Sequence, residues 1–204
     1  MDSLTLPAEK FAVARASLAD IFLSPGEDST NMVASLPASH MHDLTLIACA
    51  GISFAAMAHK SDPLEWAQVI QTNLIGCYHA IRCVLPIMRE HSFGRIICFS
   101  SVVAELPVPG TSAYAASKAA LWGLIRTVAV ENASRNVTAN CINLGYSSIG
   151  MGETGLTERM REDMLSRIPS GRFCDPDEIL RSVEFLTNTP YVTGSCLQLN
   201  GGLI

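Results

Sequence analysis

The chain has 204 residues, of which 49% are apolar and 16% are charged, and its formal net charge is −5. This length favours one domain with a substantial core, while the acidic balance and the lack of a basic run argue against nucleic acid or an anionic membrane as a partner. The most apolar stretch, residues 44–58, is too short and too interrupted to span a bilayer.

The N-terminal part of the chain differs in pattern from the rest. Residues 7–22 place Phe11 and Phe22 on one helical face, which predicts an amphipathic helix. Residues 24–31 are rich in turn-forming and polar side chains and therefore indicate a loop. We expect residues 1–42 to form an atypical segment of helix and loop that precedes the core of the protein.

The cysteines indicate the compartment in which the chain works. All seven are scattered through apolar contexts, and none forms a Cys-x-x-Cys pair. This usage is typical of free buried thiols in a reducing environment. The acidic N-terminus has no secretory signal pattern, so we expect a cytoplasmic protein. His40 and His42 have no third ligand nearby in the sequence, and we therefore expect no metal site.

From residue 43 to residue 204, short apolar runs alternate with longer amphipathic segments. The pattern predicts strands at 44–49, 95–101, 137–144 and 196–199, and helices at 62–89, 112–133 and 176–188. Asp62 and Asp175 each precede a proline, as helix N-caps do, and Pro86 is expected to kink the first helix. Strands that alternate with helices predict a single α/β domain with a doubly wound parallel sheet.

The pair Tyr114 and Lys118 is the first candidate for chemistry. A spacing of four residues near the start of a helix places the phenol and the ammonium on the same face. A free tyrosine has a pKa near ~10 and is a poor base at neutral pH. A cation close by favours the phenolate and is expected to lower that pKa. The pair is therefore a candidate proton-transfer unit, although such pairs also occur on solvated helix faces.

Two further polar positions strengthen this interpretation. Ser101, with Ser100 before it, ends an apolar strand at the carboxyl edge of the predicted sheet, where ligands usually bind. Asn73 lies in the middle of a predicted helix, where an amide has little reason to be unless it binds a buried group. The alternative for Asn73 is a hydrogen bond to a carbonyl of its own helix.

Several motifs in a fixed order extend the pattern from about residue 43 to the C-terminus. They are Ala50-Gly51, then Gly94-Arg95-Ile96-Ile97-Cys98-Phe99-Ser100-Ser101, Tyr114 and Lys118, Gly145, Asp175-Pro176-Asp177-Glu178 and Asn200-Gly201-Gly202. Together they strongly resemble the short-chain dehydrogenase/reductase family. The resemblance implies a Rossmann-like fold and an oxidoreductase that acts on the carbonyl or alcohol of a small, apolar substrate.

The resemblance also implies roles for individual residues. Tyr114 would be the general acid/base, and Lys118 would lower its pKa and hold the nicotinamide ribose. Ser101, rather than Ser100, would bind the substrate oxygen, and Asn73 would hold a water that links the lysine to solvent. An NAD(P) cofactor would contact six positions, Ala50, Gly51, Tyr114, Lys118, Gly145 and Ser147.

The chain departs from the family pattern at the phosphate site. The family begins with a strand and a glycine-rich turn that lets the backbone approach the pyrophosphate. Here Gly26 is the only glycine before Gly51, and it lies in a polar loop. We therefore expect the first strand–helix–strand portion of the fold to be missing or rebuilt. Ile149 also replaces a threonine that contacts the carboxamide in the family, and Ser147 or Ser148 is expected to substitute for it.

Three functional hypotheses follow from the sequence. The preferred one is redox chemistry that uses NAD(P), and the second is a non-redox enzyme on the same scaffold, such as a dehydratase, an isomerase or a dehalogenase. The third is a non-catalytic partner subunit of a complete relative. The apolar faces of the helices at 62–89 and 112–133 are expected to form a homodimer or homotetramer contact, as in the family.

Overall fold

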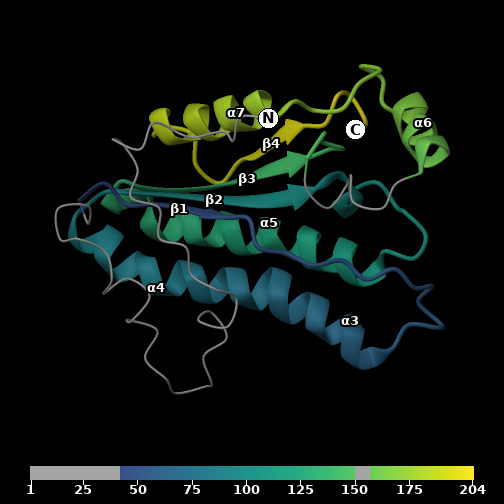
Figure 1. The fold of residues 1–204 in the computed structure, drawn as a ribbon. Coiled ribbons are helices and arrows are strands. Elements are labelled where there is room, and N and C mark those ends of the chain that lie inside the picture. The colour runs from purple at the N-terminus through teal and green to yellow at the C-terminus, as the bar shows by residue number, and fades with distance from the viewer. Residues whose placement is uncertain (1–41, 150–156) are drawn as a thin grey trace.

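Four parallel strands form the centre of the molecule (Figure 1). The computed structural model describes residues 42–149 and 157–204, so the predicted helix at 7–22 lies outside the described residues. The strands are neighbours in chain order, and each one pairs in parallel with the next. They are β1 (Thr45–Ala48), β2 (Gly94–Ser101), β3 (Val137–Leu144) and β4 (Cys196–Leu199).

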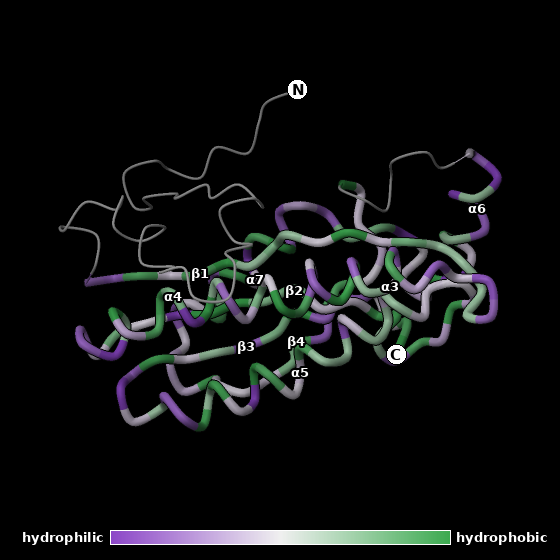
Figure 2. The backbone as a smooth tube through the Cα atoms, turned by 90° about the horizontal axis from the view of Figure 1, so that it is seen from below, coloured by the Kyte–Doolittle hydropathy of each residue, from purple (hydrophilic) through white to green (hydrophobic). Residues whose placement is uncertain are grey.

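Helices cover both faces of this sheet, which confirms the predicted doubly wound fold. Figure 1 shows α4 and α5 below the strands and α7 above them. The long helices are α3 (Pro63–Ile70), α4 (Gly76–Glu90), α5 (Ser112–Asn132), α6 (Glu158–Arg167) and α7 (Pro176–Asn188). The sequence pattern missed α6, none of whose residues is buried, and much of it is coloured hydrophilic in Figure 2.

The first predicted helix is interrupted by an irregular turn that the sequence pattern did not predict. Asp62 caps α3 as expected, because its carboxylate accepts hydrogen bonds from the Leu64 and Glu65 amides. The chain then forms a π-helical turn at Gln71–Ile75 before α4 begins. The irregular turn therefore lies between α3 and α4, whereas Pro86 lies further along the chain, inside α4.

Two apolar clusters hold the layers together. The larger lies between the sheet and the helices α4 and α5, and it contains Ile96 of β2 and Ile125 of α5. The smaller lies under α7 and joins Ile97, Ile142 and Leu186. Successive residues of β2 thus point to opposite faces, and both faces bury apolar side chains, as the strands of a covered parallel sheet do.

The free edge of β1 is the least covered part of the sheet. Within the residues that the structure describes, β2 is the only strand that pairs with β1. Ile47 of β1 is 38% exposed, whereas its register partner Ile97 is 1% exposed. No helix among the described residues is long and apolar enough to cross a membrane.

Removal of the Ile142 side chain is expected to destabilise the fold strongly. Ile142 is fully buried in the cluster under α7. Ile142→Ala should lower the free energy of unfolding by about 2–5 kcal/mol, because it leaves a cavity as well as losing apolar burial. Tyr191→Ala is the control, since Tyr191 is 99% exposed, and it should change the value by less than about 0.5 kcal/mol. Equal losses in a urea titration would contradict the described packing.

Candidate functional site

The last three residues of β2 dock onto the first turns of α5, each through a different atom. The Lys118 ammonium donates to the Phe99 carbonyl over 2.8 Å. The Ser100 hydroxyl donates to the Lys118 carbonyl over 3.0 Å. The Ser101 hydroxyl lies close enough to the Tyr114 phenol to lower the pKa of that phenol. The strand end and the helix start therefore fix the predicted Ser–Tyr–Lys set in one place at the carboxyl edge of the sheet.

Lys118 is almost completely enclosed. Only 5% of it is exposed, and its ammonium lies 5.6 Å from the centre of the Tyr114 ring. Burial lowers the pKa of Lys118 below its ordinary value, because the charged form loses its hydration. The bond to the Phe99 carbonyl keeps the ammonium beside the ring rather than in solvent.

The pKa of Tyr114 differs from the sequence-based expectation. Burial raises the pKa of the phenol above its usual value, and the hydrogen bond with Ser101 offsets only part of that effect. The expected lowering by Lys118 is wrong for the described chain. Removal of the phenolate from water is the largest effect on this pKa, and the Lys118 ammonium is itself bound to the Phe99 carbonyl. The phenol is therefore protonated at neutral pH.

Asn73 connects three segments at the floor of the site. It lies in the π-helical turn and is 1% exposed. Its amide oxygen accepts from the Ile52 amide over 2.8 Å, and its amide nitrogen donates to the Ile52 carbonyl over 2.9 Å. The same nitrogen donates to the Ser117 hydroxyl over 3.0 Å. The alternative of a local helix partner is wrong, because these partners lie 21 and 44 residues away in sequence.

Gly51 gives the site a backbone wall. A Cβ atom on Gly51 would stand 3.3 Å from the amide oxygen of Asn73 and 3.6 Å from the ammonium of Lys118. The backbone after β1 therefore approaches both polar groups with no side chain between them. The polar donors that converge here are of the kind that the nicotinamide–ribose end of a dinucleotide would require. Ala50 precedes Gly51 and is exposed.

Gly145 and Ser147 lie at the end of β3 and have other contacts. A Cβ on Gly145 would come within 2.8 Å of the Asn200 Cα, so close packing against the turn after β4 already requires glycine there. The Ser147 hydroxyl donates to the Ile149 carbonyl over 2.7 Å. Neither contact joins these residues to Tyr114 or Lys118, and their predicted cofactor role stays a prediction.

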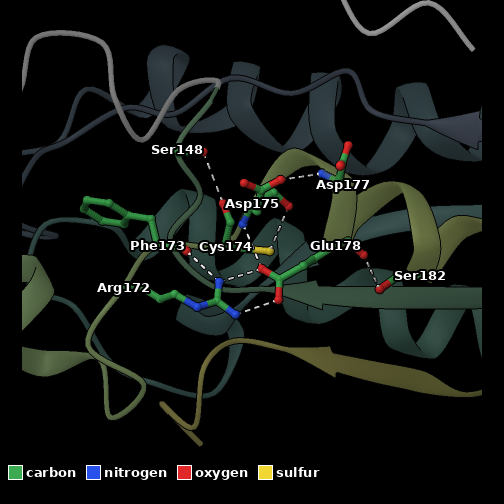
Figure 3. Close-up of polar contacts among 8 residues, drawn as sticks. All are labelled: Ser148, Arg172, Phe173, Cys174, Asp175, Asp177, Glu178 and Ser182. Carbon is green, nitrogen blue, oxygen red and sulfur yellow. Dashed lines mark hydrogen bonds and ion pairs between the residues drawn. The ribbon is translucent and has the colours of Figure 1, made fainter.

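The segment before α7 forms a separate polar cluster (Figure 3). Arg172 binds both carboxylate oxygens of Glu178 over 2.7 Å, and the hydrogen bonds lower the pKa of Glu178 to about 2. Glu178 also accepts from the Asp175 amide and completes a capping box. A nearby cavity of about 90 Å³ is lined partly by Tyr146 and Arg172. It is well below the ~300 Å³ at which ligand pockets begin, and Tyr114 does not line it.

Two supporting contacts escaped the sequence analysis. Ser117 accepts from Asn73 and donates to the Tyr114 carbonyl over 2.7 Å, and it is fully buried. Trp122 donates through its indole N–H to the Ser100 hydroxyl over 2.8 Å. Ser117 lies between Tyr114 and Lys118 in the sequence, and this position was the one signal from which its contact with the site could have been predicted. Among residues 42–149 and 157–204, no group of three or more His, Cys, Asp or Glu side chains is arranged to hold a metal ion.

Comparisons with known proteins agree with this geometry. A family model described as Enoyl-(Acyl carrier protein) reductase matches residues 25–204. A 3-oxoacyl-(acyl-carrier-protein) reductase from Thermotoga maritima is 38% identical over 161 residues, which are 78% of this chain and 65% of that protein. An acetoacetyl-CoA reductase from Shinella zoogloeoides is 38% identical over 159 residues, which are 77% of this chain and 66% of that protein.

A solved structure supports the fold. The crystal structure of a candidate gluconate dehydrogenase from Agrobacterium tumefaciens has a TM-score of 0.74 and 26% identity, and the match covers 78% of this chain and 64% of that one. The fold and the matches define a reductase-type α/β protein. The chain belongs to the short-chain dehydrogenase/reductase family. It spans about two thirds of the length of the first relatives that it matches.

The ionisation of Tyr114 provides a test of the site. The phenolate absorbance that is lost in Tyr114→Phe should develop only above pH ~10, the ordinary value, because burial raises the folded-state pKa. Ser101→Ala should raise it further, since it removes the hydrogen bond that lowers the pKa. The stability due to the neutral phenol is present below pH ~10 and is lost as pH rises through the folded-state pKa. Ionisation of Tyr114 below pH ~9 would contradict the described burial.

Asn73→Ala is expected to loosen the segment after β1. The substitution leaves the Ile52 amide and carbonyl without their partner, which should cost about 2–4 kcal/mol of unfolding free energy. Hydrogen exchange at the Ile52 amide should accelerate more than exchange in β3. Asn188→Ala is the matched control, because Asn188 is exposed and makes one hydrogen bond within α7. Unchanged exchange at Ile52 would show that the amide does not hold this segment.

Proposed function

We propose that the chain carries the catalytic residues of an NAD(P)-dependent oxidoreductase that interconverts a carbonyl and an alcohol on a small, apolar acyl substrate. The observation that carries the proposal is the convergence of Ser101, Tyr114 and Lys118 at the end of β2. The relatives are named as reductases of 3-oxoacyl-(acyl-carrier-protein) and of acetoacetyl-CoA, and these names support the substrate class.

Tyr114 supplies the proton in the direction of reduction. Its raised pKa keeps the phenol protonated at neutral pH, and a protonated phenol can donate to a carbonyl oxygen that becomes an alkoxide. The Ser101 hydroxyl stands beside the phenol and binds the same oxygen. The Lys118 ammonium lies 5.6 Å from the ring centre, so the cation stays beside the phenol during the proposed reaction.

This chain would hold the dinucleotide at its nicotinamide end. Bound reduced nicotinamide would supply the hydride to the carbonyl carbon. Lys118 would donate to the ribose, and the Gly51 backbone approaches the Lys118 ammonium with no side chain between them. Asn73 fixes that backbone through Ile52 and, in the proposed mechanism, holds the water that returns a proton to Lys118. The 204 residues contain no glycine-rich turn before Gly51 that fits the pyrophosphate.

A second role, as a subunit that completes its site with another polypeptide, is favoured by one observation. The outer edge of β1 is unpaired among the described residues, and Ile47 is partly exposed there. A partner strand at that edge would place its own carboxyl end beside Gly51. Under this role the purified chain would bind NADPH only after a complete relative is added.

Tyr114→Phe should lower NADPH-dependent reduction of acetoacetyl-CoA by about 10²–10⁴-fold, because it removes the proton donor and leaves the ring. Tyr191→Phe is the control and should keep full turnover, since Tyr191 is 99% exposed. NADPH should also quench the fluorescence of the two tryptophans. A folded chain that does not bind NADPH, or one that keeps full turnover in Tyr114→Phe, would rule out the redox proposal.

We also propose a homodimer or homotetramer that forms through α3, α4 and α5. Leu64 of α3 is 81% exposed and Val130 of α5 is 82% exposed, and both are apolar. Sedimentation at micromolar concentration should show an oligomer, and the pair of substitutions Leu64→Glu and Val130→Glu should weaken it. A wild-type chain that sediments only as a monomer would contradict this assembly.

A further inference from the structure

Four cysteines form a row across one face of the sheet. Cys98 of β2 is the register partner of Cys141 of β3, and Cys141 is the register partner of Cys196 of β4. Cys77 of α4 lies over the row, with its sulfur 3.2 Å from that of Cys98. Register partners in a parallel sheet point to the same face. We call Cys77, Cys98, Cys141 and Cys196 the thiol row.

Within the thiol row, Cys77 and Cys98 are chemically distinct. Cys98 is completely buried, whereas Cys77 keeps 9% of its exposure. The thiols share a hydrogen bond that lowers the pKa of Cys77 and raises that of Cys98. Cys77 is therefore both the more accessible sulfur and the one that more readily forms the nucleophilic thiolate. The Cys98 thiol keeps its proton and donates it in the hydrogen bond to the Cys77 sulfur.

We propose that Cys77 and Cys98 form a reversible disulfide when a hydroperoxide oxidises the protein. The Cys77 thiolate attacks the peroxide, so that an S–O bond forms, the O–O bond breaks and, after protonation, an alcohol or water leaves. The Cys98 sulfur then attacks the sulfenic sulfur of Cys77, so that the S–S bond forms, the S–O bond breaks and water leaves. The two sulfurs together lose two electrons, and the peroxide gains them.

The geometry suits this pair better than any other part of the row. The sulfurs are already 3.2 Å apart, and a disulfide needs about 2.05 Å, so bond formation requires an approach of roughly 1 Å. The bond would join α4 to β2 and close a loop between residues 77 and 98. A thiolate of an added dithiol can attack this disulfide and return both cysteines to thiols, which makes the modification reversible.

The disulfide also adjoins the candidate site. Cys77 follows Asn73 by one helical turn, and Cys98 directly precedes Phe99, whose carbonyl accepts from Lys118. Formation of the disulfide therefore shifts the backbone segments that carry Asn73 and Phe99. We expect oxidation to lower turnover reversibly, a consequence that rests on the proposed function.

The test is peroxide treatment of the full chain, followed by alkylation without reduction, digestion and mass spectrometry. The expected product is a linked peptide that joins Cys77 to Cys98 and disappears after treatment with dithiothreitol. Cys77→Ser and Cys98→Ser should each abolish it. Cys83→Ser is the matched control, because Cys83 lies on the same helix, is half-buried and stands outside the row.

The proposal is overturned if treated wild-type chain keeps Cys77 and Cys98 unlinked while exposed Cys49 becomes oxidised. A link that joins other cysteines instead would overturn it as well. These outcomes are read on the wild-type chain and do not depend on whether a serine variant folds. Absence of turnover in the reduced chain would contradict the proposed function alone, since the disulfide is detected without an activity assay.

Discussion

The docking of β2 onto α5 is the constraint on which the rest of the site depends. Three consecutive strand residues contact the helix through a backbone carbonyl and two hydroxyls, and these contacts reach Lys118 and Tyr114. Because the strand and the helix pack against each other through the larger apolar cluster, the side chains cannot separate without disturbing that cluster. The packing that stabilises the sheet therefore also fixes the positions of the Tyr114 and Lys118 side chains, as preorganised sites require.

Burial, rather than charge, dominates the electrostatics of this arrangement. Desolvation raises the pKa of Tyr114 and lowers that of Lys118, so both groups are pushed toward their neutral forms. Both shifts favour a neutral phenol, so Tyr114 keeps the proton that it is proposed to donate. Asn73 and Ser117 complete the enclosure, since each is buried and satisfied by hydrogen bonds from other segments. The site is therefore a small network of buried side chains that bind one another across segments.

Local signals in the sequence predicted much of the fold. The strands Val137–Leu144 and Cys196–Leu199 and the helix Pro176–Asn188 begin and end as predicted, because turn residues and a capping aspartate mark their ends. The π-helical turn was missed, since nothing in residues 71–75 breaks helical periodicity. Spacing identified Tyr114 and Lys118 as neighbours, but the direction of the pKa shift depends on burial, which spacing does not report. The partners of Asn73 were equally inaccessible, because they are set by tertiary contacts.

The central claim is that Ser101 and Tyr114 act on one substrate oxygen as a unit. A double-mutant cycle on the reduction of acetoacetyl-CoA tests it most directly, with Ser101→Ala, Tyr114→Phe and the double variant compared with the unaltered chain. If the two hydroxyls work as one unit, the double variant will be no slower than Tyr114→Phe alone. Independent losses whose free energies add in the double variant would contradict the account.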